Sequence, residues 1–232
     1  MPDRLSTGID NLDDMLEGGI PANSTVIIMG DKGTGKGPLV NKLMQQGLNE
    51  DQEGLYLTLD GSPDDVVEDA DYYGWDFSEY KDDQLVFIDG YSWQAGGSDS
   101  MYALDGLSDM NQMNMTFTDA MNALGDERKR VVVNSASTLL LYTDSQSTVK
   151  LLQVIGAKSS ASGGALFITI EESTHDEQTL STINHVADGV IKLKMDGDDK
   201  KISVSRMDKT DHTRDWKTMT VDKDAGEIDI EE

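Results

Sequence analysis

The chain has 232 residues and a formal net charge of −25, from 44 acidic and 19 basic residues. A surface this acidic repels phosphate backbones, which argues against nucleic-acid binding through a basic face, and the absence of cysteine excludes disulfides and thiolate metal sites. The sequence contains no run of about 18 apolar residues, so no membrane span is predicted, and its first residues lack a secretory signal. We therefore expect a cytoplasmic protein with a single domain over residues 1–232.

The acidic composition has a second explanation. Proteins of salt-saturated cytoplasms carry many Asp and Glu and few Lys over their whole surface. In molar salt the Debye length falls to about 3 Å, which removes most of the self-repulsion of such a chain. Because the apolar segments are too regular for a disordered protein, the composition favours a halophilic one.

Strand-like and helix-like apolar patterns alternate along the chain. After a short helix around Leu12, strands are predicted at residues 25–29, 54–60, 85–89, 131–134, 165–170 and 189–194. Helices are predicted at residues 39–48, 63–73, 118–124, 144–162 and 177–187. This alternation, without polar positions inside the strands, predicts a three-layer α/β domain with a mostly parallel sheet buried on both faces.

The remaining segments are predicted from turns and composition. Strands at 201–207 and 216–221, after a turn at 196–198, predict an antiparallel addition at the C-terminus, and residues 227–232 are expected to fray. Residues 96–115 are predicted to form a loop. Its methionines either fill the core beneath it or form an adaptable partner surface; they are Met101, Met110, Met113 and Met115.

A basic cluster, Arg128-Lys129-Arg130, comes directly before one of these strands. We interpret it as a solvated strand entry rather than a nucleic-acid contact.

The first long strand leads into a glycine-rich turn at residues 30–38 with the pattern G-x-x-x-x-G-K of a phosphate-binding loop. In such a loop backbone N–H groups point at phosphate oxygens, and the following helix N-terminus adds positive partial charge. The predicted nucleotide-binding residues are Asp31, Lys32, Gly33, Thr34, Gly35, Lys36, Gly37 and Pro38. Lys36 would reach the β- and γ-phosphates. The alternative is an ordinary glycine-rich turn with Lys36 in solvent.

Two residues of this turn depart from the usual pattern. Gly37 stands where a Ser or Thr hydroxyl would bind Mg²⁺, although water could fill that coordination position. Pro38 has no N–H for the α-phosphate, but the first turn of a helix tolerates proline. Together they predict weaker nucleotide binding that depends little on Mg²⁺.

Four further motifs accompany the loop. They are R-L-S-T-G-I-D-x-L-D with G-G-I-P between Arg4 and Pro21, Tyr73-Gly74-Trp75-Asp76, Thr169-x-Glu171 and Thr210-x-His212. With these motifs the chain resembles, nearly end to end, the KaiC-like branch of the RecA superfamily, a group common in archaea. The resemblance implies a RecA-type ATP-binding core that usually assembles into rings or filaments, with ATP at the subunit boundary.

The departures from this family fall on residues that the resemblance assigns to hydrolysis. Active members end the second strand in two glutamates that activate water, where this chain has Asp60 and Gly61. Asp60 is a weak candidate base, one methylene shorter, and a misplacement of about 1 Å can cost about 10²-fold in rate. The family's Walker B aspartate, which organises Mg²⁺, is replaced by Asn134.

A third departure lies at residues 206–212, which match the family's Lys-x-Arg-Gly-Thr-x-His. In the family these basic residues reach the ATP of the neighbouring subunit. Arg206 and Lys209 are therefore candidate trans phosphate contacts, whereas Asp208 reverses the charge where arginine is expected. An arginine finger is worth about 10³–10⁵ in rate.

Altered catalytic positions beside a retained phosphate cradle indicate an ATP- or ADP-binding regulatory or signalling protein with weak or no hydrolysis. Such a protein is at most a weak ATPase, has no dedicated metal site and acts through assembly. Its expected partners are copies of itself in a ring, or a regulatory protein. Two alternatives stay open: an active Mg²⁺-dependent ATPase of the recombinase- or motor-accessory type, and a scaffold that binds no nucleotide.

Overall fold

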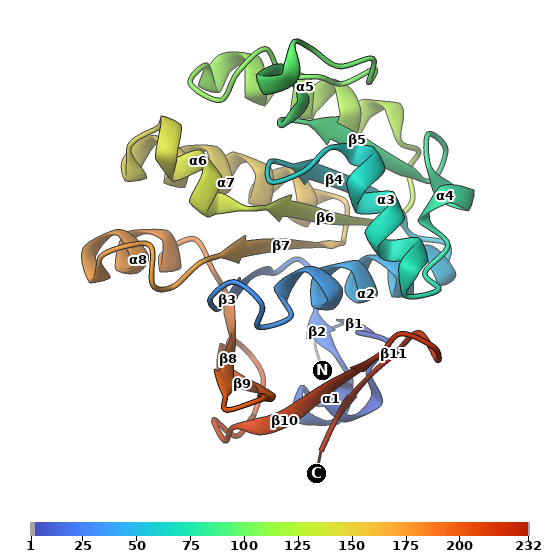
Figure 1. Cartoon of the computed structure of the whole chain (residues 1–232), viewed down its shortest axis with the longest axis vertical. Helices are drawn as coiled ribbons and strands as arrows, with labels where there is room; N and C mark the ends of the chain where they lie inside the picture. The colour runs from blue at the N-terminus through green and yellow to red at the C-terminus, as the bar shows by residue number, and fades with distance from the viewer. Residues whose placement is uncertain (1–2, 232) are drawn as a thin grey trace.

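One large sheet forms the centre of the protein (Figure 1), in a computed structural model that describes residues 3–231. Its parallel strands are β3 Thr25–Met29, β4 Glu53–Thr58, β5 Leu85–Asp89, β6 Lys129–Asn134, β7 Ala165–Ile170 and β8 Gly189–Asp196. Its antiparallel strands are β9 Asp199–Met207, β10 Lys217–Asp222 and β11 Glu227–Ile230. The order β11-β10-β9-β8-β3-β7-β6-β4-β5 confirms the predicted parallel sheet with an antiparallel C-terminal addition.

Helices cover both faces of this sheet and complete the predicted three layers. On one face lie α1 Asp10–Met15, α2 Lys36–Asn49, α3 Pro63–Tyr72 and α4 Phe77–Tyr80. On the other face lie α5 Met110–Ala123, α6 Ala136–Tyr142, α7 Ser145–Ala161 and α8 Glu177–Asn184. Neighbouring residues of β3 pack on opposite faces of the sheet. Ile28 lies in the first hydrophobic core, on the side of α1 to α4, and Ile27 lies in the second core, on the side of α5 to α8. Continuously apolar strands are what a sheet buried on both faces requires.

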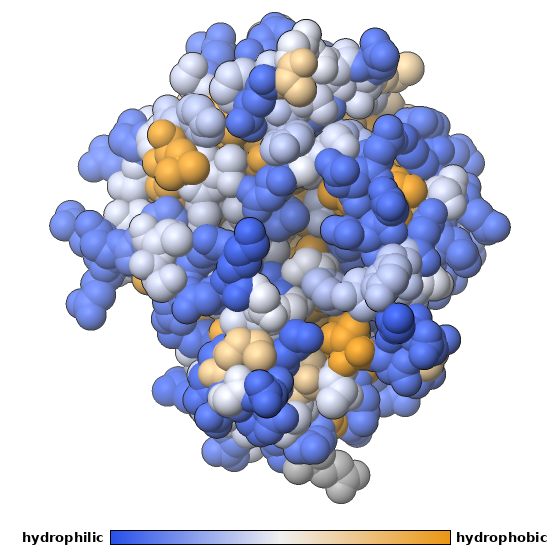
Figure 2. Space-filling model, viewed as in Figure 1, coloured by the Kyte–Doolittle hydropathy of each residue, from blue (hydrophilic) through white to orange (hydrophobic). Residues whose placement is uncertain are grey.

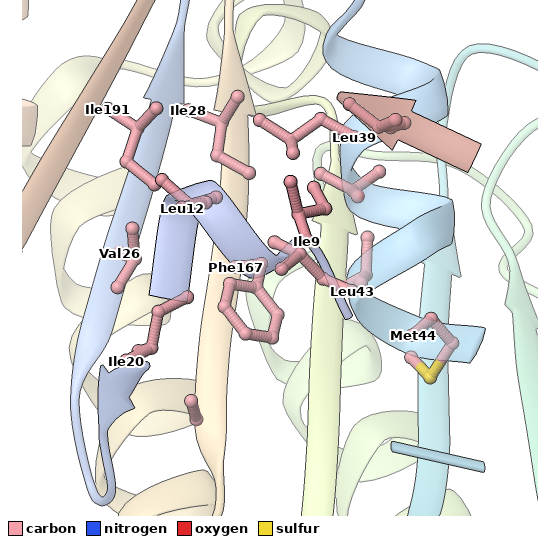
Figure 3. Close-up of a cluster of buried hydrophobic side chains, with 14 of the residues drawn as sticks. Ile9, Leu12, Ile20, Val26, Ile28, Leu39, Leu43, Met44, Phe167 and Ile191 are labelled. Atoms are coloured by element: carbon pink, nitrogen blue, oxygen red, sulfur yellow. The ribbon is translucent and has the colours of Figure 1, made fainter. Parts of the chain in front are cut away.

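The N-terminal segment closes the first face. Strands β1 Arg4–Leu5 and β2 Ile20–Pro21 pair beside α1. Figure 3 shows Ile9 and Leu12 of this segment among the side chains of β3, β7 and α2, and all of them are buried. At the opposite end of the sheet α5 packs against the edge strand β5 (Figure 1).

Acidic and hydroxyl side chains fix where several helices begin. Ser62 and Asp65 form a reciprocal capping box at the start of α3. Asp144 and Asp176 accept backbone N–H groups at the starts of α7 and α8. Caps of this kind are worth about 1 kcal/mol each, so part of the acidic surface stabilises individual helices.

Two predictions about segments were wrong, and one helix was missed. Residues 96–115 are not all loop, because Asp109 caps a helix that begins at Met110 and buries Met113 against the second core. Residues 227–230 do not fray, because β11 pairs with β10 and buries Ile228 and Ile230; residue 232 lies outside the described residues. Helix α6 was not predicted at all.

The prediction of a solvated basic cluster was wrong for two of its three residues, because Lys129 and Arg130 are the first residues of β6 and are buried, whereas Arg128 is partly exposed. Arg130 is only 1% exposed and donates to the side-chain oxygen of Gln52 at 2.9 Å and to a carboxylate oxygen of Glu50 at 3.3 Å. Lys129 is also buried and pairs with Glu53 at 2.8 Å. Burial lowers the pKa of Arg130 to about 10, so it stays a cation at neutral pH. These side chains hold α2 and β4 against β6.

The face of the molecule in Figure 2 is mostly hydrophilic, with small scattered apolar areas. Between residues 3 and 231, none of the helices combines the length and the apolar character that crossing a bilayer requires.

Candidate functional site

The glycine-rich turn joins β3 to α2 at the carboxyl end of the parallel strands. Gly33 and Gly35 take φ values of 85° and 103°, in the left-handed region that glycine adopts without steric cost. Thr34 steadies the turn by donating from Oγ1 to the backbone oxygen of Asp31 at 2.8 Å. Around Gly33 and Gly37 a Cβ would meet no atom within 4 Å, so this side of the turn is open.

Lys36 folds back over the turn. Its Nζ donates to the backbone oxygens of Gly30 at 2.7 Å and Asp31 at 2.9 Å. Burial lowers the pKa of Lys36 below its ordinary value. Three carboxylates act against this shift, those of Glu171, Asp31 and Asp60. The ammonium therefore lies at the mouth of the turn, where phosphate oxygens would meet it.

Asp31 is also fixed, although its side chain is exposed. Its Oδ1 accepts the backbone N–H of Ser173 at 2.9 Å, in the segment that follows β7. Hydrogen bonds from Ser173 lower the pKa of Asp31 below its ordinary value. The turn is thus tied to the neighbouring strand end, with an ionised carboxylate on its outer side.

The altered catalytic positions lie at the ends of β4 and β6. Asn134 accepts a hydrogen bond from Thr169 Oγ1 of β7 at 2.6 Å. Asp60 is exposed and accepts a hydrogen bond from the hydroxyl of Thr138 in α6. The structure therefore places Asn134 and Asp60 at the same edge as the turn, with neighbouring hydroxyls on their side-chain oxygens.

A second polar cluster adjoins this edge, and the sequence reasoning missed it. Ser137 Oγ accepts the backbone N–H of Glu171 at 2.9 Å and hydrogen-bonds His175 Nε2, also at 2.9 Å. Burial lowers the pKa of His175. No sequence signal indicates Ser137 or His175, because their contact depends on how α6 meets the segment after β7. Glu171 was part of a recognised motif, but nothing in that motif indicated its effect on Lys36.

Arg206 is held by its own chain. Its Nη2 donates to the backbone oxygens of Asn184, at 3.3 Å, and Ala187, at the C-terminal end of α8. It also lines a cavity of about 520 Å³ beside β8, together with Glu172 and Lys192. Among the described residues, neither Arg206 nor Lys209 donates a hydrogen bond to the glycine-rich turn of the same chain.

The opening and closing motifs of the sequence meet through Arg4. Arg4 Nη1 donates to the backbone oxygen of Gly19 at 2.9 Å and to Thr210 Oγ1 at 3.0 Å. Its Nη2 donates to the backbone oxygen of Lys209 at 3.2 Å. Lys209 has a φ of 58°, a conformation in which the family pattern places glycine. These motifs therefore have a common structural task, to join the two ends of the domain.

The donor set fits a polyphosphate better than a metal ion. Backbone N–H groups of a glycine-rich turn, a helix start and an ammonium group are the usual partners of phosphate. Gly37 brings no hydroxyl for Mg²⁺, and Asn134 brings no charge. Within the part of the chain that the structure describes, no three His, Cys, Asp or Glu side chains gather closely enough to hold a metal ion.

Comparison with known proteins identifies the family. Residues 5–232 match the family model described as "ATPase: KaiC", and the chain therefore belongs to the KaiC-like ATPases of the RecA superfamily. It is 31% identical to a UPF0273 protein of Aeropyrum pernix, over 84% of this chain and 79% of that protein. It is 28% identical to a UPF0273 protein of Methanopyrus kandleri, over 84% and 77% of the two chains.

A solved structure supports the fold. The crystal structure of a KaiC-like protein from the archaeon Pyrococcus horikoshii superposes with a TM-score of 0.78 and covers 100% of both chains, at 19% sequence identity. The resemblance and the fold class inferred from the sequence are thereby confirmed.

Proposed function

We propose that the protein binds ATP or ADP at residues 30–38, hydrolyses it weakly or not at all, and acts through assembly or through binding a regulatory partner. The observation that carries the proposal is the position of Lys36, whose ammonium lies on the backbone oxygens of Gly30 and Asp31 at the mouth of the turn. Family membership supports nucleotide binding, since the matching model is that of an ATPase.

Weak hydrolysis is supported by the residues that stand at the positions which the family resemblance assigns to catalysis. Asn134 is neutral and its side-chain oxygen already accepts from Thr169. Asp60, the candidate base, is short and accepts from Thr138. A general base must reach the proton that it removes, directly or through one water. Asp60 is one methylene shorter than the family's glutamate and would have to bridge a longer gap, so we expect turnover to be very slow.

Little dependence on Mg²⁺ follows from the same residues. When bound, Mg²⁺ would neutralise phosphate charge, but the chain offers neither a hydroxyl at Gly37 nor a carboxylate at Asn134 to hold it. Mg²⁺ keeps several waters in protein sites, so its binding would rest mainly on the phosphates.

Assembly is the part of the proposal that concerns Arg206 and Lys209. They would contact the phosphates of a neighbouring copy, as the family pattern implies. Arg206 would do so while capping α8, because its Nη2 holds the helix end whereas its Nη1 donates no hydrogen bond among the described residues. Light scattering with and without ATP tests this step: a ring predicts a multimer whose stability falls on Arg206→Ala, and a monomer under all conditions would contradict it.

We also propose that the protein is halophilic, on the basis of its charge of −25. Screening in molar salt weakens repulsion between its carboxylates. Its melting temperature should therefore rise steeply between 0.1 and 3 M KCl; a flat profile would contradict this.

Calorimetric titration with ATP and ADP in molar KCl, with and without Mg²⁺, tests nucleotide binding. We expect binding without Mg²⁺ and at least about 10-fold weaker binding by Lys36→Ala, since hydrogen bonds to a charged group are worth about 1.5–3 kcal/mol. Lys223→Ala is the matched control, because this lysine is exposed and, between residues 3 and 231, has Tyr72 as its one hydrogen-bond and cation–π partner. No binding by the unaltered chain would favour the scaffold, and turnover above about 1 s⁻¹ with a strict Mg²⁺ requirement would favour an active ATPase.

A further inference from the structure

We propose that Lys200, on the hairpin formed by β8 and β9, is a second cation for the phosphate chain of the nucleotide bound in the same subunit. The hairpin would thereby supply in cis part of the positive charge that Mg²⁺ supplies in other phosphate sites. This inference rests on the proposed function, because it presumes that the turn at residues 30–36 binds a nucleoside di- or triphosphate.

The side chain of Lys200 packs against the glycine-rich turn. A Cβ on Gly35 would lie 3.5 Å from Lys200 Cδ and 3.9 Å from its Cε, and 2.7 Å from the ε-methyl of Met219. These two side chains cover Gly35, which is buried. The Lys200 ammonium lies one bond of about 1.5 Å beyond Cε, so it is near the residue that directly precedes Lys36.

The ammonium of Lys200 has no partner within the described chain. It takes part in none of the hydrogen bonds or ion pairs found among residues 3–231, although it is half-buried. Two other lysines of the hairpin differ: Lys192 pairs with Glu172 at 2.6 Å, and Lys201 donates to Thr218 Oγ1 at 2.8 Å. In a chain with 44 acidic residues, an ammonium beside a phosphate-binding turn and without a carboxylate is positioned for a different anion.

Strand β9, which carries this lysine, is paired with β8 on one side and with β10 on the other. Lys200 is opposite Met219 in the register of β9 and β10. The turn after β10 is anchored by Gly226, whose backbone oxygen accepts from Trp75 Nε1 at 2.9 Å and from Lys42 Nζ at 3.1 Å. Lys42 belongs to α2, the helix that begins at the glycine-rich turn. Functional groups on rigid elements are positioned better than groups on loops, so the backbone of Lys200 is held at a constant place beside the turn.

The charges around the turn explain what the ammonium of Lys200 would contribute to nucleotide binding. Lys36 is accompanied by the carboxylates of Glu171, Asp31 and Asp60, which would also repel a polyphosphate. Without protein ligands for Mg²⁺, the phosphate charge must be met by other cations. A second ammonium at the turn favours a di- or triphosphate over an uncharged nucleoside, and partly buried pairs are screened by salt much less than exposed ones.

Lys200→Met in the full chain tests the assignment, with Lys201→Met as the matched control one residue away. Titration calorimetry in molar KCl without Mg²⁺ would compare ATP, ADP and adenosine. We expect Lys200→Met to weaken ATP binding about 10-fold or more, to leave adenosine binding unchanged and to make ATP affinity more dependent on added Mg²⁺. Lys201→Met should stay within about 2-fold of the unaltered chain.

The outcomes separate this inference from the proposed function. Equal ATP affinity of Lys200→Met and the unaltered chain, or equal losses in both variants, would overturn the role of Lys200 while leaving nucleotide binding in place. Absence of ATP binding by the unaltered chain would instead overturn the proposed function. Should Lys200→Met lower the melting temperature, Lys200→Gln repeats the comparison with a polar side chain at the same place, and unchanged affinity there would equally overturn the assignment.

Discussion

Thr169 Oγ1 donates to the side-chain oxygen of Asn134 at 2.6 Å, across the carboxyl ends of the neighbouring strands β7 and β6. Asn134 stands where the family has its Walker B aspartate, and its side-chain oxygen therefore already accepts a hydrogen bond from the Thr169 hydroxyl. Both side chains lie in the middle of the sheet, and Thr169 is fully buried. Asn134 is therefore part of a structural polar pair at the position where the family resemblance places the Walker B aspartate.

Replacing Thr169 by Val should leave this amide oxygen without its donor. Asn134 is half-buried, so the variant loses one hydrogen bond rather than leaving a fully buried acceptor unsatisfied. Thr169→Val should therefore lower the free energy of unfolding by about 0.5–1.5 kcal/mol in denaturant titrations. Thr138→Val is the control, because its partner Asp60 is exposed and water can replace the hydroxyl. Equal losses in the two variants would show that the Asn134 contact has no special weight.

Restoring the missing hydroxyl should restore part of the dependence on Mg²⁺. A Cβ at Gly37 would meet no atom within 4 Å, so Gly37→Thr fits without repacking, and threonine is the better helix former. We expect the ratio of ATP affinities with and without Mg²⁺ to rise in Gly37→Thr and to rise further when Asn134→Asp is added. Gly37→Val, which has the same shape without the hydroxyl, should not raise it.

The buried guanidinium of Arg130 should be much more important for stability than the exposed pair of Arg128. Arg130 is buried and donates to the side-chain oxygen of Gln52 and the backbone oxygen of Leu43, as well as to the exposed Glu50. Arg130→Met removes the donor of these buried acceptors, and an unsatisfied buried acceptor costs about 1–3 kcal/mol. Exposed pairs are worth about 0–1 kcal/mol, so Arg128→Met, which loses its pair with Asp3, should change the melting temperature little. Similar losses would contradict the burial of Arg130.

Asp89 should contribute stability that is lost in acid. Burial acts to raise its pKa, but hydrogen bonds from Ser98, Ser92 and Tyr91 outweigh burial and lower it. Because the folded-state pKa is below the unfolded value, the stabilisation is complete above about pH 3.9 and disappears as pH falls through the folded-state pKa.

Ser98→Ala removes one of these donors and should bring the folded-state pKa of Asp89 closer to its ordinary value. The stability of Ser98→Ala should therefore depend less on pH between about 2 and 5 than that of the unaltered chain. Denaturant titrations across this range measure the slope, and identical slopes would show that the Ser98 hydroxyl does not favour the ionised form.

Local patterns predict most of the sheet. Each parallel strand is a short apolar run, and the runs are separated by helix periodicity, so strand and helix types follow from the sequence. Strand β11 could not be found this way: Ile228 and Ile230 alternate with acidic residues and become a strand only beside β10. The burial of Arg130 was equally inaccessible, because it depends on Glu50 and Gln52, which lie far away in the sequence.

At the candidate site, too, contiguous motifs could be predicted from the sequence, whereas contacts between distant segments could not. The phosphate-binding turn is a contiguous motif, so its residues, including Gly37 and the altered Asn134 further along, could be read directly. The cover of Gly35 by Met219 and Lys200 could not, because it comes from a hairpin near the other end of the chain. Geometry of this kind is set by strand order, which the sequence pattern leaves open.

We propose above all that the protein holds nucleotide without turning it over efficiently. The most direct measurement is to equilibrate the protein with ATP and Mg²⁺ in molar KCl, isolate the complex by rapid gel filtration and determine the bound nucleotide over time by chromatography. We predict that ATP co-elutes with the protein and is recovered largely intact, with turnover far below about 1 s⁻¹. Conversion to ADP at or above that rate, or a protein fraction free of nucleotide, would contradict the claim.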